Sequence, residues 1–418
     1  MTHFRQKTAR PLGRRSLLKL LGAAPLGAAA VPTACAMART GGGDGGSGAS
    51  FDTSQGQCGP PPADLLPGGA YDQHLTAMAA SDQFSGTVLL ALAGRPVLAR
   101  AFGWADKERG IPNHTGTLFN LESVTKIFTG VAVAQLAAQG KIGFHATLGS
   151  YLDGFPAQIA DTVTVHQMLT HTAGVGEYPQ TQAFLNEWQV WNSAGEVFDG
   201  IMTIIRTLPL AFTPGTRYQY SNAGFYVLGA IVAQVSGQSY YDYMRQHVFS
   251  PAGMTRTDFY TMPQMLTSHD FAHPYVTRDG QHIDVASEGT FIGGPDHGAY
   301  SSGPDLLAFS RALESGRLLT PAYTELALSG KYPVARATGE PAAQSISIGY
   351  GVENLIVNNQ RVFGHPGGAA GANTDLNVYP GVGWVAAVLG NYAFDVASLL
   401  QLQNQLITQQ PSRCVPDA

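Results

Sequence analysis

The sequence predicts an α+β fold, in which an antiparallel β-sheet is flanked by helices and a mainly helical region is inserted into the chain. Strand-like segments rich in β-branched and aromatic residues occur near residue 90 and return after about residue 345. The segment between them, about 156–285, has helical patterns joined by loops. We therefore expect both ends of the chain to contribute strands to one sheet.

The elements follow in order along the chain. A short helix is expected from Tyr71, followed by two strands around a turn at Gly94 and by a helix that starts near Val124 and ends at Gly140. The two early strands span 84–91 and 96–103, the late strands span 345–353, 360–364, 374–379 and 384–389, and a last amphipathic helix spans 396–407. The predicted sheet region is thus 71–155 with 286–410, and the helical region is 156–285.

The N-terminus has the features of an export signal. Residues 1–36 contain six basic residues, no acidic residue and an apolar run from Leu20 to Val31. Arg14-Arg15 resembles the twin-arginine type of signal, and the triplet at 34–36 has the small residues that signal peptidase cuts after. About 12 apolar residues are too few to cross a bilayer, which takes ~20. We expect an exported protein, periplasmic or extracellular, with lipidation of Cys35 as the alternative.

Composition limits the partners of the exported chain. Residues 37–69 are rich in glycine and proline and are expected to form a flexible linker. Without the signal, 18 basic and 29 acidic residues remain, a formal charge of −11, which disfavours nucleic acid and anionic membranes. No transmembrane segment is expected in the mature chain. Cys58 and Cys414 form an even pair in an oxidising compartment, which predicts a disulfide between them.

Ser123 and Lys126 are the first candidate catalytic pair. They lie at the start of the predicted helix, and residues three apart share one helix face, so the lysine amine can reach the serine hydroxyl. A serine alcohol becomes a useful nucleophile when a nearby group removes its proton, and a helix N-terminus favours negative charge there. This pair predicts an acylation site.

A second candidate pair, Tyr220 and Asn222, follows a Pro-Gly turn at 214–215. A phenol beside an ammonium is expected to ionise more readily, because the positive charge favours the phenolate. Tyr220 could then take the serine proton and pass it to a leaving group, while the amide of Asn222 could donate to a substrate carbonyl.

A third candidate motif runs from His365 to Gly371 at the end of a predicted strand. Glycines there let another backbone or a ligand come close. The N–H of Gly368 is expected to join the N–H of Ser123 in an oxyanion hole, where one donor contributes ~3 kcal/mol to transition-state binding. Pro366 has no N–H and cannot serve.

Taken together, Ser123-x-x-Lys126, Tyr220-x-Asn222 and His365-x-Gly367 resemble the three motifs of serine β-lactamases and penicillin-recognising enzymes. The tyrosine resembles the class C branch, which includes D-alanyl-D-alanine carboxypeptidases, D-amino-acid peptidases and family VIII esterases. The resemblance covers about residues 80–392 and includes flanking segments at 102–106, 169–174 and 251–255. It implies a β-lactamase/transpeptidase-like fold with the site at the junction of sheet and helical region.

The same resemblance implies a role for each residue. Ser123 would be the acylated nucleophile, Lys126 its proton partner and Tyr220 the general base and later acid. The remaining motif residues would bind substrate or the oxyanion: Asn222, His365, Gly367 and Gly368. The family uses no cofactor. His365 stands where β-lactamases of this class have lysine, and a mostly neutral histidine does not replace a fixed cation as an anchor for a substrate carboxylate.

Other signals carry less weight. His269 and His273 are four apart, but Pro274 interrupts the helix that would align them, so no metal site is expected. His171 is interpreted as a hydrogen-bonded structural residue, and Glu177 and Arg217 as possible edges of the pocket. The absence of G-x-S-x-G argues against an α/β-hydrolase. Loops 175–200 and 286–300 are expected to set specificity.

The predicted function is an exported serine hydrolase that forms an acyl-enzyme on Ser123. Its substrate would be a small molecule or peptide, namely an amide or ester of a D-amino-acid-like peptide or a small acyl group. Two alternatives stay open on the sequence: a class C-like β-lactamase, and a non-catalytic module that binds cell-wall peptide or penicillin. The sequence leaves the oligomeric state undetermined.

Overall fold

The computed structural model describes residues 60–334 and 343–409. The predicted signal (1–36), most of the predicted linker (37–69), and Cys35, Cys58 and Cys414 lie outside these ranges. In the described end of the predicted linker, the 3₁₀ turn η2 (Ala63–Leu65) already packs on the fold, because Leu65 is fully buried.

One eight-stranded sheet organises the structure, and every pair of adjacent strands in it is antiparallel. Its order is β2-β1-β14-β13-β12-β11-β10-β9. The strands are β1 (Gly86–Leu92), β2 (Arg95–Phe102), β9 (Tyr332–Val334), β10 (Ala343–Ile348), β11 (Glu353–Val357), β12 (Gln360–Ala369), β13 (Ala372–Tyr379) and β14 (Trp384–Gly390). Because β1 pairs with β14 along its whole length, the predicted sheet built from both ends of the chain is confirmed.

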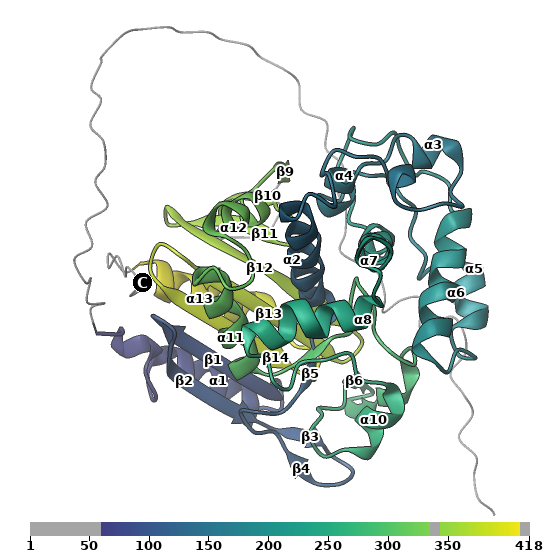
Figure 1. Ribbon diagram of the computed structural model, residues 1–418. Coiled ribbons are helices and arrows are strands. Elements are labelled where there is room, and N and C mark those ends of the chain that lie inside the picture. The colour runs from purple at the N-terminus through teal and green to yellow at the C-terminus, as the bar shows by residue number, and fades with distance from the viewer. Residues whose placement is uncertain (1–59, 335–342, 410–418) are drawn as a thin grey trace, which may run out of the picture.

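Helices cover both faces of this sheet (Figure 1). Alternate residues of a strand point to opposite faces, so Val88 and Leu90 meet one layer while Leu89 and Ala91 meet the other. The outer layer consists of α1 (Ala70–Ala80) and α13 (Val396–Thr408). The inner layer contains α2 (Thr125–Ala138), α11 (Gly303–Glu314) and α12 (Pro321–Leu328).

Residues 157–236 of the inserted helical region lie on the far side of α2 from the sheet (Figure 1). The whole region comprises α3 (Ala157–Ala160), α4 (Val165–Leu169), α5 (Gln182–Glu187), α6 (Ala194–Thr207), α7 (Asn222–Ser236), α8 (Tyr240–Tyr243), the π-helical turn η5 (Met244–Phe249), α9 (Ser250–Ala252) and α10 (Met262–Thr267). Its apolar side chains join the core of the inner layer, so the two regions share one continuous core.

Short segments complete the described chain. They are the strands β3 (Trp104–Asp106), β4 (Ile111–Pro112), β5 (Phe119–Asn120), β6 (Tyr275–Arg278), β7 (Gln281–Asp284) and β8 (Tyr300–Ser301), and the 3₁₀ turns η3 (Glu122–Val124), η4 (Leu148–Ser150) and η6 (Ala286–Glu288). Of the helices in residues 60–334 and 343–409, none combines the length and apolar character needed to cross a membrane.

Helix α2 is buried on nearly all sides because most of its residues are apolar and Lys126 is its only charged residue. Gly130 lets it approach the loop between β10 and β11, since a Cβ there would lie 2.2 Å from the carbonyl oxygen of Tyr350. This close contact fixes the position of the helix that carries Lys126.

Strand β9 and the short strands β3 to β8 were not predicted, and two of the predicted late strands have different bounds in the structure. The segment predicted as one strand, 345–353, contains the end of β10, a turn and the first residue of β11. Gly351 has φ of +78°, which suits a turn and not an extended strand. In contrast, β12 does not end at Gly364 but continues through the glycines to Ala369, paired with β13.

Candidate active site

Ser123 and Lys126 lie together, as the three-residue spacing predicts. Ser123 is in the 3₁₀ turn η3, which runs directly into α2, and Lys126 is in the first turn of α2. The Nζ of Lys126 donates to the Oγ of Ser123 at 3.1 Å.

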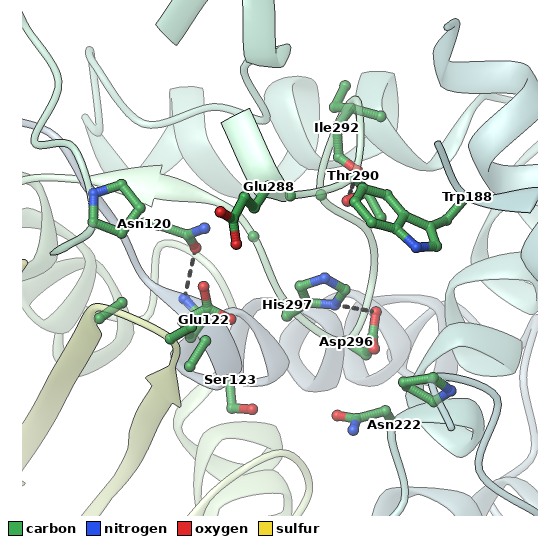
Figure 2. A pocket seen from close by; sticks show the side chains of 18 of the residues that line it. Asn120, Glu122, Ser123, Trp188, Asn222, Glu288, Thr290, Ile292, Asp296 and His297 are labelled. Carbon is green, nitrogen blue, oxygen red and sulfur yellow. Dashed lines mark hydrogen bonds and ion pairs between the residues drawn. The ribbon is translucent and has the colours of Figure 1, made fainter. Parts of the chain in front are cut away.

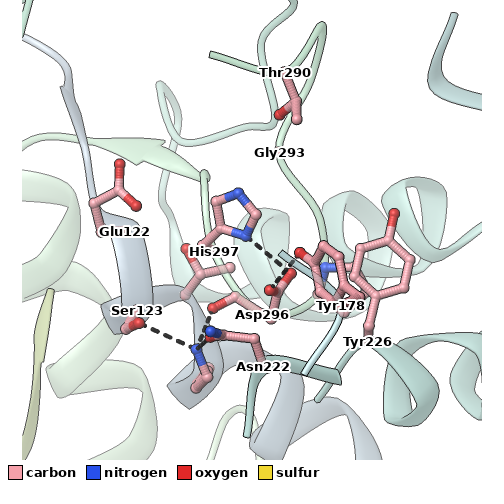
Figure 3. A network of polar contacts seen from close by, with 12 residues as sticks. Glu122, Ser123, Tyr178, Asn222, Tyr226, Thr290, Gly293, Asp296 and His297 are labelled. Atoms are coloured by element: carbon pink, nitrogen blue, oxygen red, sulfur yellow. Dashed lines mark hydrogen bonds and ion pairs between the residues drawn. The ribbon is translucent and has the colours of Figure 1, made fainter. Parts of the chain in front are cut away.

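Two further acceptors surround the amine of Lys126 (Figure 3). It donates to Oδ1 of Asn222 at 2.8 Å and to the carbonyl oxygen of Asp296 at 2.6 Å. Lys126 is fully buried, and this burial lowers its pKa to about 8, although the negative charges of Asp296, Glu177 and Glu122 oppose the shift. A fraction of the amine is therefore neutral near neutral pH and able to accept a proton.

Tyr220 reaches the same oxygen from another direction. Its hydroxyl donates to Ser123 Oγ at 2.8 Å. The ring stacks on His171, with centroids 4.4 Å apart, and His171 Nδ1 accepts from the backbone N–H of Ser221 at 3.0 Å. The prediction that His171 is a hydrogen-bonded structural residue is confirmed, and its stacking orients the phenol.

The expectation that Tyr220 is readily a phenolate is wrong. Burial raises the pKa of Tyr220 well above 10, despite the hydrogen bond to Ser123 and the amine of Lys126 lying 4.8 Å from the ring centroid. Removal from water disfavours the charged phenolate more than these neighbours favour it. Of the two groups that contact Ser123 Oγ, Lys126 is the one whose pKa is shifted toward neutrality.

Asn222, the first residue of α7, ties the second motif to the pocket edge. Its Nδ2 donates to Oε2 of Glu177 at 3.1 Å, while its Oδ1 accepts from Lys126. Glu177 lines the pocket, as expected. Arg217 instead lies over the ring of Phe212, 4.6 Å from its centroid, and does not contribute to the pocket lining.

The third motif comes close to the nucleophile through its glycines. A Cβ on Gly367 would lie 2.2 Å from the carbonyl oxygen of Leu121, so glycine permits β12 to touch η3 at this point. Gly368 and Ser123 line the same pocket. The third motif therefore borders the nucleophile on the side where an oxyanion hole is expected.

His365 lies behind Tyr220, with ring centroids 6.1 Å apart, and is 4% exposed. It lines a small hollow with Tyr220 and Tyr218 and does not line the pocket that contains Ser123. Burial and the charge of Lys126 lower its pKa to about 3, so the imidazole is neutral at physiological pH.

The pocket in front of Ser123 has a volume of about 290 Å³ (Figure 2). Both predicted specificity loops contribute to it, 175–200 and 286–300. The apolar part of the lining includes Tyr178, Phe184, Trp188, Met262, Met265 and Ile292. The polar part includes Asn120, Glu122, Glu177, Glu288, Asp296 and His297.

Sequence reasoning missed Asp296 and His297. The buried carboxylate of Asp296 accepts from Tyr178 Oη at 2.8 Å and lies 3.0 Å from Nδ1 of His297 (Figure 3). The backbone oxygen of Asp296 is also the shortest contact of Lys126. No local pattern marks these residues, because their role depends on the path of the loop that carries them.

The two histidines discounted as metal ligands, His269 and His273, differ in burial: His269 is exposed, whereas His273 is buried and its Nδ1 lies 2.7 Å from Oδ2 of Asp284. In residues 60–334 and 343–409, no group of three or more histidine, cysteine, aspartate or glutamate side chains is arranged to hold a metal ion.

Comparison with known proteins agrees with this arrangement. A family model described as Beta-lactamase matches residues 71–405. Penicillin-binding protein 4* of Bacillus subtilis is 30% identical over 312 residues, which cover 71% of this chain and 66% of that protein. Esterase EstB of Burkholderia gladioli is 34% identical over 207 residues, covering 46% of this chain and 50% of that protein. The chain thus spans between half and two thirds of these relatives.

Among solved structures, a penicillin-binding protein from Bacillus halodurans superposes with a TM-score of 0.70 at 27% identity. The match covers 80% of this chain and 99% of that one. The sheet flanked by helices is therefore a known architecture, and the predicted fold is confirmed.

The lowered pKa of Lys126 predicts how the reactivity of Ser123 depends on pH. Only the neutral amine can take the serine proton, so reaction with a fluorophosphonate should accelerate as pH rises through about 8 and fall roughly tenfold per unit below it. This pH dependence is measured by following the rate of labelling with intact-mass spectrometry from pH 6 to 9.5. Lys126→Arg keeps a charge throughout this range and should abolish the rise; a wild-type rate independent of pH would contradict the assignment.

Proposed function

Because the chain belongs to the Beta-lactamase family, we propose that it is a serine hydrolase that forms an acyl-enzyme on Ser123. The observation that supports this most directly is the position of Ser123 Oγ, which contacts both an amine of lowered pKa and a phenol. A non-catalytic binding module has no need for either group at its serine.

In the acylation step, neutral Lys126 accepts the proton of Ser123 while Oγ bonds to the substrate carbonyl carbon. The carbonyl oxygen becomes an oxyanion and is held by the N–H groups of Ser123 and Gly368. When the bond to the leaving group breaks, the departing atom takes the proton of Tyr220. The Lys126 ammonium then returns a proton to Tyr220.

Deacylation follows the same route in reverse. A water molecule attacks the acyl carbon and gives its proton through Tyr220 to Lys126. Ser123 Oγ then leaves the acyl carbon and recovers a proton from the Lys126 ammonium. Both steps use the lysine as the proton store and the tyrosine as the group that faces the leaving or entering atom.

The proposed substrates are amides or esters of a D-amino-acid-like peptide or a small acyl group. A pocket of about 290 Å³ with a largely aromatic and aliphatic wall accommodates such an acyl part. Strong β-lactamase activity is disfavoured, because buried, neutral His365 supplies no cation for a substrate carboxylate.

We also propose that the chain is exported, since residues 1–36 carry a twin-arginine-like signal. The mature protein should begin at Met37 and be recovered outside the cytoplasm. N-terminal sequencing after expression in a bacterium with that export route measures both. Replacing both Arg14 and Arg15 by lysine should retain the precursor in the cytoplasm, whereas export of that variant would contradict the proposal.

Formation of the acyl-enzyme is tested by intact-mass spectrometry. Wild-type protein mixed with a fluorophosphonate should gain one adduct, and a peptide map should place it on Ser123. Ser123→Ala should gain none and should lose hydrolysis of p-nitrophenyl esters by at least ~10³-fold. An unlabelled wild type, or equal labelling of the variant, would exclude Ser123 as the nucleophile.

The role of Tyr220 is tested by varying the leaving group. Tyr220→Phe keeps the ring that stacks on His171 but removes the proton donor. It should slow hydrolysis of an acyl anilide, whose nitrogen must be protonated to leave, by about 10²-fold or more, and that of a p-nitrophenyl ester much less.

Tyr218→Phe is the matched control for Tyr220→Phe. Tyr218 stacks against Tyr332, whereas the side chains that donate to Ser123 Oγ are those of Lys126 and Tyr220. Equal slowing of both substrates by Tyr220→Phe would assign Tyr220 a merely structural role.

A further inference from the structure

Glu122, the residue before the nucleophile, has an unusual backbone. Its φ is +49°, in the left-handed region that non-glycine residues seldom adopt. Two contacts accompany this conformation: the N–H of Glu122 donates to Asn120 Oδ1 at 2.9 Å, and the Cβ of Glu122 lies beside Gly367 of β12. The side chain is thereby directed into the pocket (Figure 2). Backbone strain of this kind is often kept where it serves a binding site.

The carboxylate of Glu122 has no hydrogen-bond or ion-pair partner in the described part of the chain. Its surroundings remove much of its contact with water, and burial raises its pKa. A carboxylate in such a place is destabilised unless a cation or hydrogen-bond donor approaches it. The pocket thus contains a carboxylate that a cation arriving from outside the protein would stabilise.

Burial raises the pKa of Glu122 even though the charges of His297 and Lys126 oppose the shift, and neither cation forms an ion pair with it in the described residues. His297, the one basic side chain in the pocket lining, lies against Asp296, whose charge raises its pKa. Lys126 lies below the pocket with its three protons directed to three acceptors. Glu177 and Glu288 add further negative charge to the lining. A substrate carboxylate entering this pocket would meet repulsion.

The position of the pocket shows which part of a substrate meets Glu122. The pocket is lined by Ser123, Asn222 and Gly368, whereas Tyr220 and His365 do not line it and border a separate small hollow. The proposed proton donor to the leaving group is Tyr220, so the leaving group belongs on the Tyr220 side. The acyl part then occupies the large pocket beside Glu122.

From this arrangement we propose that Glu122 selects substrates whose acyl part carries an ammonium group near the scissile carbonyl. The α-amino group of an amino acid, in its ammonium form, is such a group. The ammonium would pair with the Glu122 carboxylate, and acyl groups bearing a carboxylate would be rejected. This inference rests on the proposed function and narrows its substrate class to amides and esters of free amino acids or peptides with a free N-terminus.

Three small amides of nearly equal shape test the proposal at pH 7. Alaninamide carries an ammonium, isobutyramide replaces it by a methyl group, and methylmalonamic acid replaces it by a carboxylate. Each is added during fluorophosphonate labelling of Ser123, so that binding is measured without turnover. Alaninamide, in its D or L form, should halve the labelling rate at a concentration at least tenfold below that of isobutyramide, and methylmalonamate should be the weakest.

Glu122→Gln keeps the size of the side chain and removes its charge, so it should reduce the advantage of alaninamide over isobutyramide to about twofold or less. The control is Glu187→Gln, which removes the same charge from an exposed position that does not line the pocket, and it should keep the advantage. If the three amides slow labelling of Ser123 equally, or if alaninamide keeps its advantage in Glu122→Gln, this inference alone is overturned. Absence of any labelling of Ser123 would instead overturn the proposed function.

Discussion

The candidate site depends on one buried amine. Lys126 is the only charged side chain in α2, and its Nζ is held by three oxygens from three parts of the chain: Ser123 Oγ, Asn222 Oδ1 and the backbone oxygen of Asp296. Burial favours the neutral amine, whereas these acceptors and nearby carboxylates favour the ammonium. The balance sets a pKa of about 8, near enough to neutrality for the same group to accept and return a proton.

The rest of the fold holds the partners of this amine in place. Helix α2 is packed between the sheet and the helical region, and Gly130 lets it touch the loop before β11. Gly367 lets β12 approach η3, which places Gly368 in the same pocket as Ser123. The stacked ring of His171 fixes the plane of Tyr220. Ser123, Lys126 and Gly368 thus sit on packed elements, and Tyr220 lies just before α7 with its ring held by His171, so little reorganisation is needed when substrate arrives.

Local rules allowed much of this to be predicted from the sequence. Helix geometry alone puts Ser123 and Lys126 on one face, and segments rich in β-branched and aromatic residues between turns located most of the sheet. Properties that arise from burial were not predictable in the same way. The pKa of Tyr220 moved opposite to the expectation because desolvation outweighs the nearby amine, and His365 lies behind Tyr220 instead of in the pocket. Asp296 and Glu122 were missed because their roles depend on a loop path and on a left-handed backbone conformation.

We propose that one lysine controls the chemistry of this protein and that the charge beside its serine controls selectivity. The claim that Lys126 accepts the serine proton is tested by NMR titration of Lys126, with ¹³C-labelled lysine and the Lys126→Arg variant to assign the signal. The Cε resonance of Lys126 should titrate with a midpoint near pH 8 in the unliganded protein. A midpoint near the ordinary lysine value of about 10.4 would contradict the claim, because the amine would then be a permanent cation that could not accept the serine proton.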